Sequence, residues 1–420
     1  MAEGKFHTLD IHSVVIDAGA GLTKIGYAGD EAPRYVAPSV FGLKNKFQEP
    51  SSMDSSEYIN SELYLHSRRP NLDIISPYDG FGLFSDWKGI EQHWHYIFNY
   101  LGIIPEESPI LICEPAHNTR DHREKLTTML FESFNVPAVY FAKNPVLSTF
   151  ANGRTSGLVF DFGASHTSVS PVLEGTLINK ANVFSILGGN AVTQLLDVGL
   201  TLQGVNLRPR YRLSQRDGEE VIDLGLTGIR PSFDNFHRFL LVNDIKHALC
   251  SVSEYPIDPT QGVPSTPHEA YYLPDGQQVH VSSLSTALPE LYFNTRIGTY
   301  LKEVIGDALT IDVSKSYSVM EQAKTVFGAL DGDTRREVFS NFIVSGGGSL
   351  LTGLKDRLIK EVESVFNIGN RVLSLDDSDR KWTNWIGGSI LSNLSAFHQL
   401  WVSKQEFSEH GISVVERKCK

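Results

Sequence analysis

Two aspartates, each placed after a short apolar run, are the residues in this sequence best suited to chemistry. The run at 14–16 leads into Asp17 and the run at 158–160 leads into Asp161, and each aspartate is followed two residues later by a glycine. A buried strand that delivers Asp-x-Gly into a tight turn places a carboxylate at the edge of a cleft, and the glycine lets backbone N–H groups approach an anion. Either motif alone also fits an ordinary strand-to-turn corner.

The two motifs are parts of an internal repeat, because the match continues without a gap and places Thr23 against Thr167. The interval is too long for a solenoid repeat, so it predicts two similar domains that each begin with a strand, an aspartate and a turn. Facing each other, the two hairpins would hold a triphosphate from both sides. Asp17 and Asp161 would bind Mg²⁺ through water, because this ion usually keeps several of its waters. Lys24 would add positive charge beside the phosphates.

A third glycine-rich element follows an apolar run at 342–344, with glycine at 346, 347 and 348. Consecutive glycines leave the backbone open to a flat ring or a phosphate. The element lacks the Lys-Ser/Thr ending of a P-loop. A flexible loop is the alternative interpretation of this motif taken alone.

The elements that must position these motifs alternate between strand-like and helix-like patterns, which indicates an α/β architecture. Residues 119–134 read as an amphipathic helix that ends before Pro137. The polar segment 43–60 and the proline-rich segment 254–270 are predicted to be surface loops. The sequence Pro274-Asp275-Gly276 predicts a hairpin turn.

Composition limits the classes of function. The 420 residues are 41% hydrophobic and 20% charged, with 37 Lys and Arg against 49 Asp and Glu, for a net charge of −12. This balance argues against direct, sequence-specific DNA binding, which needs concentrated positive charge. The three cysteines are far apart and show no zinc-binding spacing. The sequence contains no apolar run of about 18 residues, so it predicts no membrane span. A cytosolic or nuclear protein is expected.

Beyond these patterns, the chain resembles the actin family, and the similarity covers nearly all of it, weakening at about 43–75 and 205–335. The matching segments, in order, are Asp17–Lys24, Gly29–Arg34, Arg123–Lys125, Gly153–Thr155, Trp385–Ile390 and Ser403–Phe407. The resemblance implies the α/β fold that actin shares with heat-shock chaperone ATPases and sugar kinases, with two similar α/β domains around a nucleotide cleft. The first domain would comprise 1–151 and 382–420, with a small insertion at 39–76. The second would comprise 152–381, with an insertion at 188–304.

Within the family the chain is most similar to nuclear actin-related proteins of the fourth class. The shared segments are Phe150–Arg154, Gly163–Thr167, Phe397–Trp401 and Val415–Cys419. The resemblance implies that the cofactors are ATP and Mg²⁺. The nucleotide-contacting positions that it implies are Gly19, Gly21, Leu22, Lys24, Gly163, Ser165, His166, Gly189, Lys246, Gly347, Leu350 and Lys381.

Several positions depart from the actin pattern. The glutamine that orients the attacking water in actin corresponds to Asn144, and the histidine that assists proton transfer corresponds to Ser168. Ala20, Ala164 and His247 replace further polar groups of the actin site. Phosphoryl transfer depends on a positioned water and on charge stabilisation. The resemblance therefore implies nucleotide binding with at most weak residual hydrolysis, and no catalytic residue is assigned.

The resemblance also implies a role as a structural subunit of a nuclear chromatin-remodelling or histone-acetyltransferase complex. The expected partners are a helical segment of the motor subunit and actin or another actin-related protein, with histones or nucleosomes as further contacts in the complex. The expected location is the nucleus, with the cytoplasm as a second one, and no membrane contact is expected. Apolar residues of segment 386–401 recur at helical spacing. The implied partner groove is formed by Phe150, Thr155, Ile390, Leu391, Leu394 and Leu400.

Two other functions are compatible with the family. One is a cytoplasmic cytoskeletal or motor-adaptor protein that assembles into filaments, with segment 43–60 acting between subunits. The other is a sugar kinase or chaperone ATPase, which would need a catalytic base over a substrate cleft. The sequence offers no candidate for that base.

Overall fold

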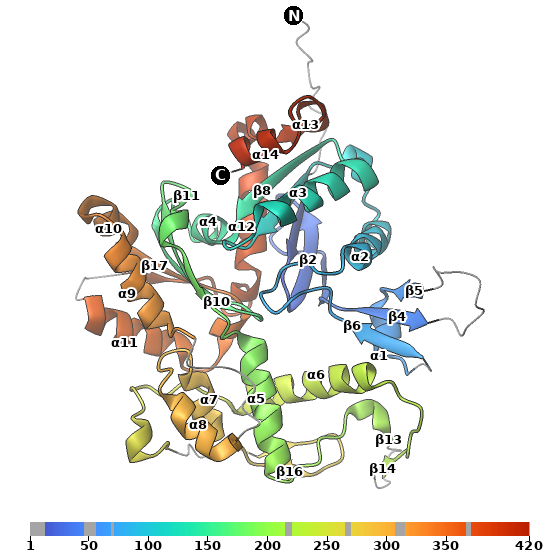
Figure 1. The fold of residues 1–420 in the computed structure, drawn as a ribbon, viewed down its shortest axis with the longest axis vertical. Coiled ribbons are helices and arrows are strands. Elements are labelled where there is room, and N and C mark those ends of the chain that lie inside the picture. The colour runs from blue at the N-terminus through green and yellow to red at the C-terminus, as the bar shows by residue number, and fades with distance from the viewer. Residues whose placement is uncertain are drawn as a thin grey trace, which may run out of the picture.

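The computed structural model describes residues 13–45, 56–68, 71–214, 221–264, 270–306, 316–366 and 371–419. Parts of two segments predicted to be loops, 46–55 and 265–269, lie outside the described residues, as do residues 1–12 of the expected first domain. Two large mixed sheets, each with helices around it, dominate the fold (Figure 1).

The first large sheet has its strands in the order β19-β8-β7-β1-β2-β3. The central β1 and β7 are parallel neighbours, and β1 forms an antiparallel hairpin with β2. The bounds are β1 Val14–Ala18, β2 Leu22–Tyr27, β3 Tyr35–Pro38, β7 Ile110–Glu114, β8 Ala138–Lys143 and β19 Val402–Ser403. All residues of β7 are buried, as expected for a central strand covered on both faces.

Helices from both ends of the sequence accompany this sheet. They are α2 Trp87–Leu101, α3 Arg120–Thr128, α4 Asn144–Ala151, α12 Thr383–Asn393, α13 Lys404–His410 and α14 Ile412–Lys418. Thr119 caps α3 by accepting a hydrogen bond from the His122 N–H, and a π-helical turn extends the helix to Ser133. The predicted helix at 119–134 is confirmed.

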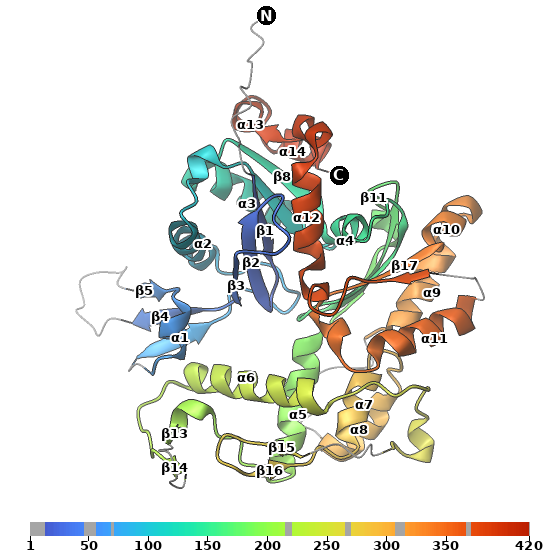
Figure 2. The same cartoon turned by 180° about the vertical axis from the view of Figure 1, so that it is seen from behind.

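The second large sheet has the order β11-β10-β9-β17-β18, and β12 also pairs with β10. Its strands are β9 Gly157–Phe162, β10 Thr167–Leu173, β11 Thr176–Leu177, β12 Val183–Ser185, β17 Asn341–Ser345 and β18 Arg371–Leu373. The helices α9 Val319–Ala329, α10 Gly332–Val338 and α11 Leu354–Phe366 lie beside it in Figures 1 and 2.

Two further groups of elements complete the fold, one beside the first large sheet at the right of Figure 1 and the other at the bottom. One is a small sheet in the order β5-β4-β6, made of β4 Phe41–Asn45, β5 Ser56–Ile59 and β6 Leu72–Ile75 and accompanied by α1 Glu62–His66. The other contains α5 Gly189–Leu202, α6 Pro231–Leu249, α7 Leu284–Glu290 and α8 Ile297–Ile305, with the short hairpins β13 Leu213–Ser214 with β14 Ile222–Asp223 and β15 Tyr271–Tyr272 with β16 Gln278–Val279. The predicted turn at Pro274-Asp275-Gly276 joins the last pair and is confirmed.

Helix α12 lies between the two large sheets in both views (Figures 1 and 2). The buried indole N–H of Trp385 donates to the carbonyl of Val15 in β1 at 3.1 Å, and Gly387 lies against the backbone of Leu147 in α4. The last part of the chain is therefore packed against its first strand. The α/β class predicted from the sequence is confirmed. Within the described residues, no helix combines the length and apolar character needed to cross a membrane.

Candidate nucleotide-binding site

The two Asp-x-Gly motifs form hairpins with the same register. Asp17 in β1 is paired with Lys24 in β2, and Asp161 in β9 is paired with Ser168 in β10. In each hairpin the aspartate's partner therefore lies seven positions further along the chain. The repeat seen in the sequence corresponds to two structurally equivalent hairpins, one in each large sheet.

Each hairpin turn is closed by a backbone hydrogen bond and lies against the other hairpin. The N–H of Gly19 donates to the Leu22 carbonyl at 3.2 Å, and that of Gly163 donates to the His166 carbonyl at 2.9 Å. A Cβ placed on Gly21 would lie only 2.8 Å from the Cβ of Ala164. Glycine is needed at position 21 because any side chain would push the two turns apart.

The charged groups of the two hairpins influence one another. The Lys24 ammonium lies 2.6 Å from a carboxylate oxygen of the buried Asp17, and Ser345 Oγ donates to Asp161 Oδ1 at 3.0 Å. Desolvation raises the pKa of Asp161, and the negative charge of Asp17 adds to this effect, while Ser345 and Lys24 partly oppose it. A cation placed near both carboxylates would relieve their repulsion.

The third glycine-rich element lies directly beside the second hairpin. Strand β17 runs parallel to β9 and pairs Ser345 with Asp161. Gly346 has φ +86°, and a Cβ there would collide with the Phe162 carbonyl and the Asp161 carboxylate. The short helical turn Gly347–Leu350 follows.

Lys381 lies next to this turn, because a Cβ on Gly347 would be 4.0 Å from the Cβ of Lys381. The Lys381 ammonium lies 4.3 Å from the centre of the Trp382 ring. The three expected ligand contacts Gly347, Leu350 and Lys381 are thus brought together, and the turn that carries two of them follows strand β17 beside Asp161.

Helix α5 begins against the second hairpin turn. The N–H groups of Gly189 and Asn190 donate to the carbonyls of Gly163 and Ala164 at 2.9 and 2.8 Å. The buried Lys246 of α6 donates to the Gly189 carbonyl at 3.2 Å, to Thr193 Oγ1 at 2.9 Å and to Asn243 Oδ1 at 2.8 Å.

Lys246 therefore has acceptors for all three of its ammonium hydrogens within α5 and α6. Burial lowers its pKa to about 8. The resemblance implied a nucleotide contact for Lys246, and the structure places its ammonium beside Gly189 at the second turn, where it holds the two helices together.

A group of aromatic rings lies behind the second turn. The rings of His117 and His166 are 4.5 Å apart edge to face, and His117 stacks on Phe184 at 4.7 Å. His166 Nδ1 is 2.9 Å from Ser165 Oγ, and His117 Nε2 is 3.0 Å from the Phe81 carbonyl. Burial, with a smaller effect of His117, lowers the pKa of His166 to about 3, so His166 is neutral at physiological pH. His117 and Phe184 could not be predicted from the sequence, because an isolated histidine and an isolated phenylalanine form no pattern.

Asn144 and Ser168, two of the five positions that depart from the actin pattern, have different surroundings. Asn144 begins α4, and its Oδ1 is buried without a hydrogen-bond partner in the part of the chain that the structure describes. A buried carbonyl oxygen of this kind is costly unless a donor, such as a water, reaches it. Ser168 is buried in β10 directly opposite Asp161.

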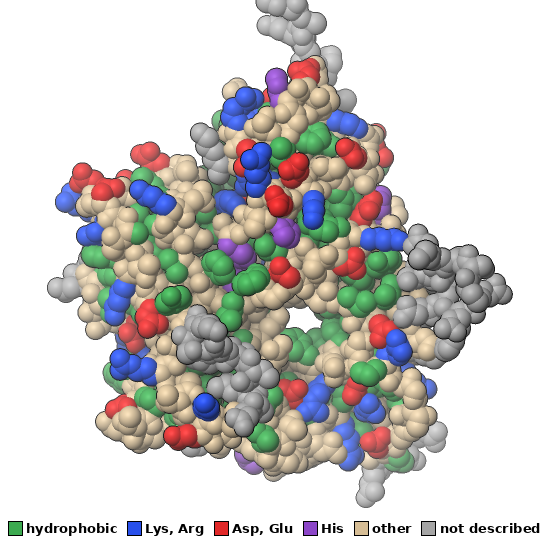
Figure 3. Space-filling view, in the orientation of Figure 1, with side chains coloured by type: hydrophobic (Ala, Val, Ile, Leu, Met, Phe, Trp, Pro, Cys, Tyr) green, Lys and Arg blue, Asp and Glu red, His purple; other side chains and the backbone are tan. Residues whose placement is uncertain are grey.

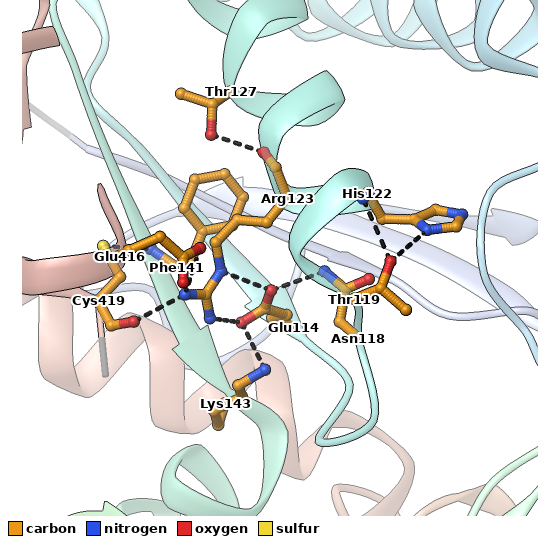
Figure 4. A network of polar contacts seen from close by, with 10 residues as sticks. All are labelled: Glu114, Asn118, Thr119, His122, Arg123, Thr127, Phe141, Lys143, Glu416 and Cys419. Atoms are coloured by element: carbon orange, nitrogen blue, oxygen red, sulfur yellow. Dashed lines mark hydrogen bonds and ion pairs between the residues drawn. The ribbon is translucent and has the colours of Figure 1, made fainter. Parts of the chain in front are cut away.

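Beside Asn144, a buried polar network connects the end of β8 with the last helix (Figure 4). The Lys143 ammonium is 2.9 Å from Glu114 Oε2, and the Arg123 guanidinium donates to both oxygens of Glu114 at 2.9 and 2.5 Å. Arg123 also donates to the Cys419 carbonyl at 3.0 Å and reaches Glu416 at 3.4 Å.

The pKa of Glu114 is lowered: desolvation opposes ionisation, but the hydrogen bond from Arg123 and the charges of Lys143 and Arg123 outweigh it. The network stabilises the strand ends that border the cleft.

The space-filling view shows an opening near the middle of the molecule (Figure 3). Figure 1 has the same orientation and shows that the opening is bordered by the first hairpin, the small sheet and helices α5 and α6. A cavity of about 920 Å³ lies elsewhere, between α2 and α3, and includes Trp87, Asp121, Glu124 and Lys125. The lining of that cavity includes neither Asp17 nor Asp161 and no glycine, so the cavity is not the candidate site.

The residues of the cleft fit a nucleotide with Mg²⁺. Backbone turns at Gly19–Leu22 and Gly163–His166 offer N–H groups for phosphates, and Asp17 and Asp161 offer carboxylates. No group of three or more His, Cys, Asp or Glu side chains among the described residues could hold a metal. Two carboxylates without further protein ligands suit an ion that keeps most of its waters.

Of the residues expected to form the partner groove, Ile390, Leu391 and Leu394 lie at the end of α12, and Phe150 packs against the apolar cluster that contains Leu391. Ile390, Leu394 and Leu400 are 42, 48 and 45% exposed, Leu391 is buried and Phe150 is half-buried. Thr155 is exposed after α4. Helix α12 ends at Asn393 and Leu394 is extended, so the apolar stripe at 386–401 does not continue on one helix as the helical spacing suggested.

The fold and the paired hairpins together define a protein of the actin class, and the chain belongs to the actin family, whose defining sequence pattern matches residues 8–420. Among curated relatives, it is similar to actin-related protein 4 of Arabidopsis thaliana, with 35% identity over 98% of this chain and 99% of that protein. It is equally similar to actin-related protein 4 of the indica and japonica subspecies of Oryza sativa, with 35% identity, 98% of this chain and 99% of those proteins. The predicted family and its actin-like fold are confirmed.

Proposed function

We propose that this protein is an ATP-binding structural subunit of a nuclear chromatin-remodelling or histone-acetyltransferase complex. The observation that carries the proposal is the direct approach of two equivalent hairpins, which brings Asp17 and Asp161 to one cleft. The turns would bind the phosphates of ATP, and the two carboxylates would hold Mg²⁺ through water. When bound, Mg²⁺ neutralises phosphate charge.

The same site argues for little or no hydrolysis. Asn144 is one methylene shorter than the glutamine that orients water in actin, and Ser168 has no basic group. Neither Asn144 nor Ser168 can take up a proton from the attacking water. In this proposal ATP therefore acts as a bound cofactor that stabilises the closed arrangement of the two domains, since a ligand that binds only the folded state stabilises it.

The partner assignment rests on the exposed apolar residues near the end of α12. Ile390, Leu394 and Leu400 lie in the region that in actin relatives takes an amphipathic helix. We infer that a helical segment of a remodeller motor subunit binds there, with actin or another actin-related protein on the same helix. The similarity to actin-related protein 4 of two plants supports this class of partner.

The proposal is tested by tagging the chain in its own cells and purifying it from nuclear extract. Mass spectrometry of the purified material should find a motor subunit and an actin-type protein, and denaturation should release ATP or ADP in stoichiometric amount. Filaments of the chain alone, with no motor subunit recovered, would favour the cytoskeletal function instead.

A further inference from the structure

The cavity of about 920 Å³ between α2 and α3 takes no part in the proposed nucleotide site. One wall follows α3 and the π-helical turn after it, from Asp121 to Ser133, and the other is the first part of α2, from Trp87 to Gln92. The wall residues of α3 share one side of the helix, with the spacing i, i+3, i+4, i+7 of Asp121, Glu124, Lys125 and Thr128. The cavity is therefore a groove that extends along α3 for about 18 Å, at about 1.5 Å a residue. We use the name α2–α3 groove for it.

Aromatic contacts fix the two walls relative to each other at both ends of the groove. At one end, the Trp87 ring of α2 lies 5.6 Å from the His122 ring of α3, and His122 Nε2 lies 3.0 Å from the Phe84 carbonyl. Beyond the other end, the His95 ring of α2 lies 4.3 Å from the Phe134 ring. A groove with fixed walls binds a ligand with less loss of conformational entropy than one that must first form. The α2–α3 groove is therefore preorganised for a ligand.

Apolar side chains form the inner part of the groove. Met129 is buried, and Trp87 is half-buried and belongs to the lining. Met129 also begins the π-helical turn Met129–Ser133, and such turns are rare and frequently lie at functional sites. A thioether adapts to the shape of an apolar side chain, and an indole offers a large flat surface. The groove can therefore take apolar side chains of a ligand.

Charged side chains surround these apolar residues. Glu91, Asp121 and Glu124 line the groove, and none of the three makes a salt bridge with another residue that the structure describes. Lys88 and Lys125 add two ammonium groups. The carboxylates outnumber these ammonium groups, and the whole chain has a net charge of −12. Charge complementarity therefore favours a basic ligand over an acidic one.

We propose that the α2–α3 groove binds a basic amphipathic helix of a partner protein. Apolar side chains of that helix pack on Trp87 and Met129, and its lysine or arginine side chains lie beside Glu91 and Glu124. The groove has the length of about three helical turns, and a helix meets such a surface through anchors at i, i+3, i+4 and i+7. The site is separate from the nucleotide cleft and from the residues at the end of α12. The inference thus adds a second partner surface and does not depend on ATP binding.

The first experiment measures binding of a designed probe to the purified full chain by fluorescence anisotropy. The probe is a fluorescein-labelled peptide of about 14 residues, with leucine at i, i+3, i+4 and i+7 and lysine at the flanking positions. It should bind the wild-type chain. The double variant Glu91→Lys and Glu124→Lys should weaken binding by about tenfold or more, because two attractive charges become repulsive.

The matched control is the double variant Glu107→Lys and Glu132→Lys, which changes the net charge by the same amount. Both residues are exposed, and neither lines the groove, although Glu132 lies on the same π-helical turn. This control should bind the probe nearly as well as the wild type. Circular dichroism should show both double variants folded. A probe with glutamate in place of lysine, or with a proline in its centre, should bind weakly.

A second measurement locates the probe on the chain. Binding removes the Trp87 ring from water, so the tryptophan emission of the wild-type chain should shift to shorter wavelength. Trp87→Phe keeps an aromatic ring in the groove, so it should still bind the unlabelled probe but lose most of the shift. A shift that persists in Trp87→Phe would place the probe elsewhere and overturn the inference.

Three further results would also overturn it. One is the absence of probe binding to the wild-type chain, and another is an equal loss of affinity in the groove variant and in the control. The third comes from sedimentation without the probe. A wild-type dimer that becomes a monomer in the double variant Glu91→Lys and Glu124→Lys would show that a second copy of the chain occupies the groove, in place of a partner helix.

Discussion

The ammonium of Lys24 lies 2.6 Å from the carboxylate of Asp17, its register partner in the first hairpin. In the second hairpin the equivalent position holds Ser168, so Asp161 has no cation opposite it in the register. The two carboxylates of the cleft are consequently unequal. Asp17 is already paired, whereas Asp161 has a raised pKa and gains more from a metal ion.

This inequality predicts how Mg²⁺-ATP binding depends on pH. Because the pKa of Asp161 is raised, protonation of Asp161 begins at a higher pH than for an ordinary aspartate, and a protonated carboxyl group is a poor metal ligand. Affinity should be full at high pH and fall as pH falls through this pKa. Calorimetric titrations with Mg²⁺-ATP would measure it, and Asp161→Asn should remove most of the dependence and weaken binding at every pH. Equal pH profiles for wild type and Asp161→Asn would contradict the assignment.

Hydrolysis should be close to background in the wild-type chain, and Asn144→Gln should raise it. A longer amide can reach and orient a water that the shorter one holds poorly, and orientation of the attacking water lowers the barrier to hydrolysis. Single-turnover measurements with labelled ATP would detect the change. Asn152→Gln, at the other end of α4, is the matched control and should have no effect. Wild-type hydrolysis as fast as that of filamentous actin would show that the site is not degenerate.

Partner binding should depend on the exposed apolar residues beside α12. Leu394→Asp places a charge among Ile390 and Leu400 and should abolish co-purification of the motor subunit. Leu63→Asp is the control, because Leu63 is 74% exposed on α1, at a different surface. Circular dichroism should show both variants folded. Normal co-purification of the motor subunit with the Leu394→Asp chain would contradict the proposed partner groove.

Buried histidines should make the protein sensitive to acid. Burial lowers the pKa of His93 to about 4, while an unfolded histidine titrates near 6.5, so the unfolded state binds a proton first as pH falls. The contribution of neutral His93 to the free energy of unfolding is therefore fully present above about pH 6.5. It is lost progressively as pH falls toward 4, by up to about 3 kcal/mol. Urea denaturation at several pH values would measure the slope. His93→Gln should reduce it, whereas His398→Gln, with an exposed ring, should leave it unchanged.

The part of the site that depends on local pattern could be predicted from the sequence. A strand, Asp and Gly in a fixed order specify a hairpin turn, and the repeat of that order specified two. The family resemblance named Lys246 as a nucleotide-contacting position, but its internal hydrogen bonds could not be predicted, because its three acceptors come from α5 and α6 and depend on how those helices pack. His117 and the Glu114–Arg123–Lys143 network escaped for the same reason, since burial and partners are tertiary properties.

The fold, too, has features that local sequence patterns predict and features that depend on tertiary contacts. The α/β class follows from alternating patterns, and the helix at 119–134 follows from its amphipathic spacing. The apolar spacing at 386–401 did not predict that α12 ends at Asn393. The extended backbone of Leu394 is not encoded in the side-chain pattern. The apolar contact of Phe233 in α6 with the small sheet joins segments that have no relation in sequence, so only the assembled structure reveals it.

The pairing of β19 with β8, and of Trp385 with Val15, has a consequence for biosynthesis. Strand β1 leaves the ribosome long before the side chains that cover it, because 370 positions separate Val15 from Trp385. During most of synthesis, the β1–β7–β8 core therefore lacks α12 and β19, and its apolar face stays open to water and to other chains. Contacts between such distant parts of a sequence also form slowly. The unfinished chain therefore exposes an aggregation-prone apolar face until α12 and β19 have been made.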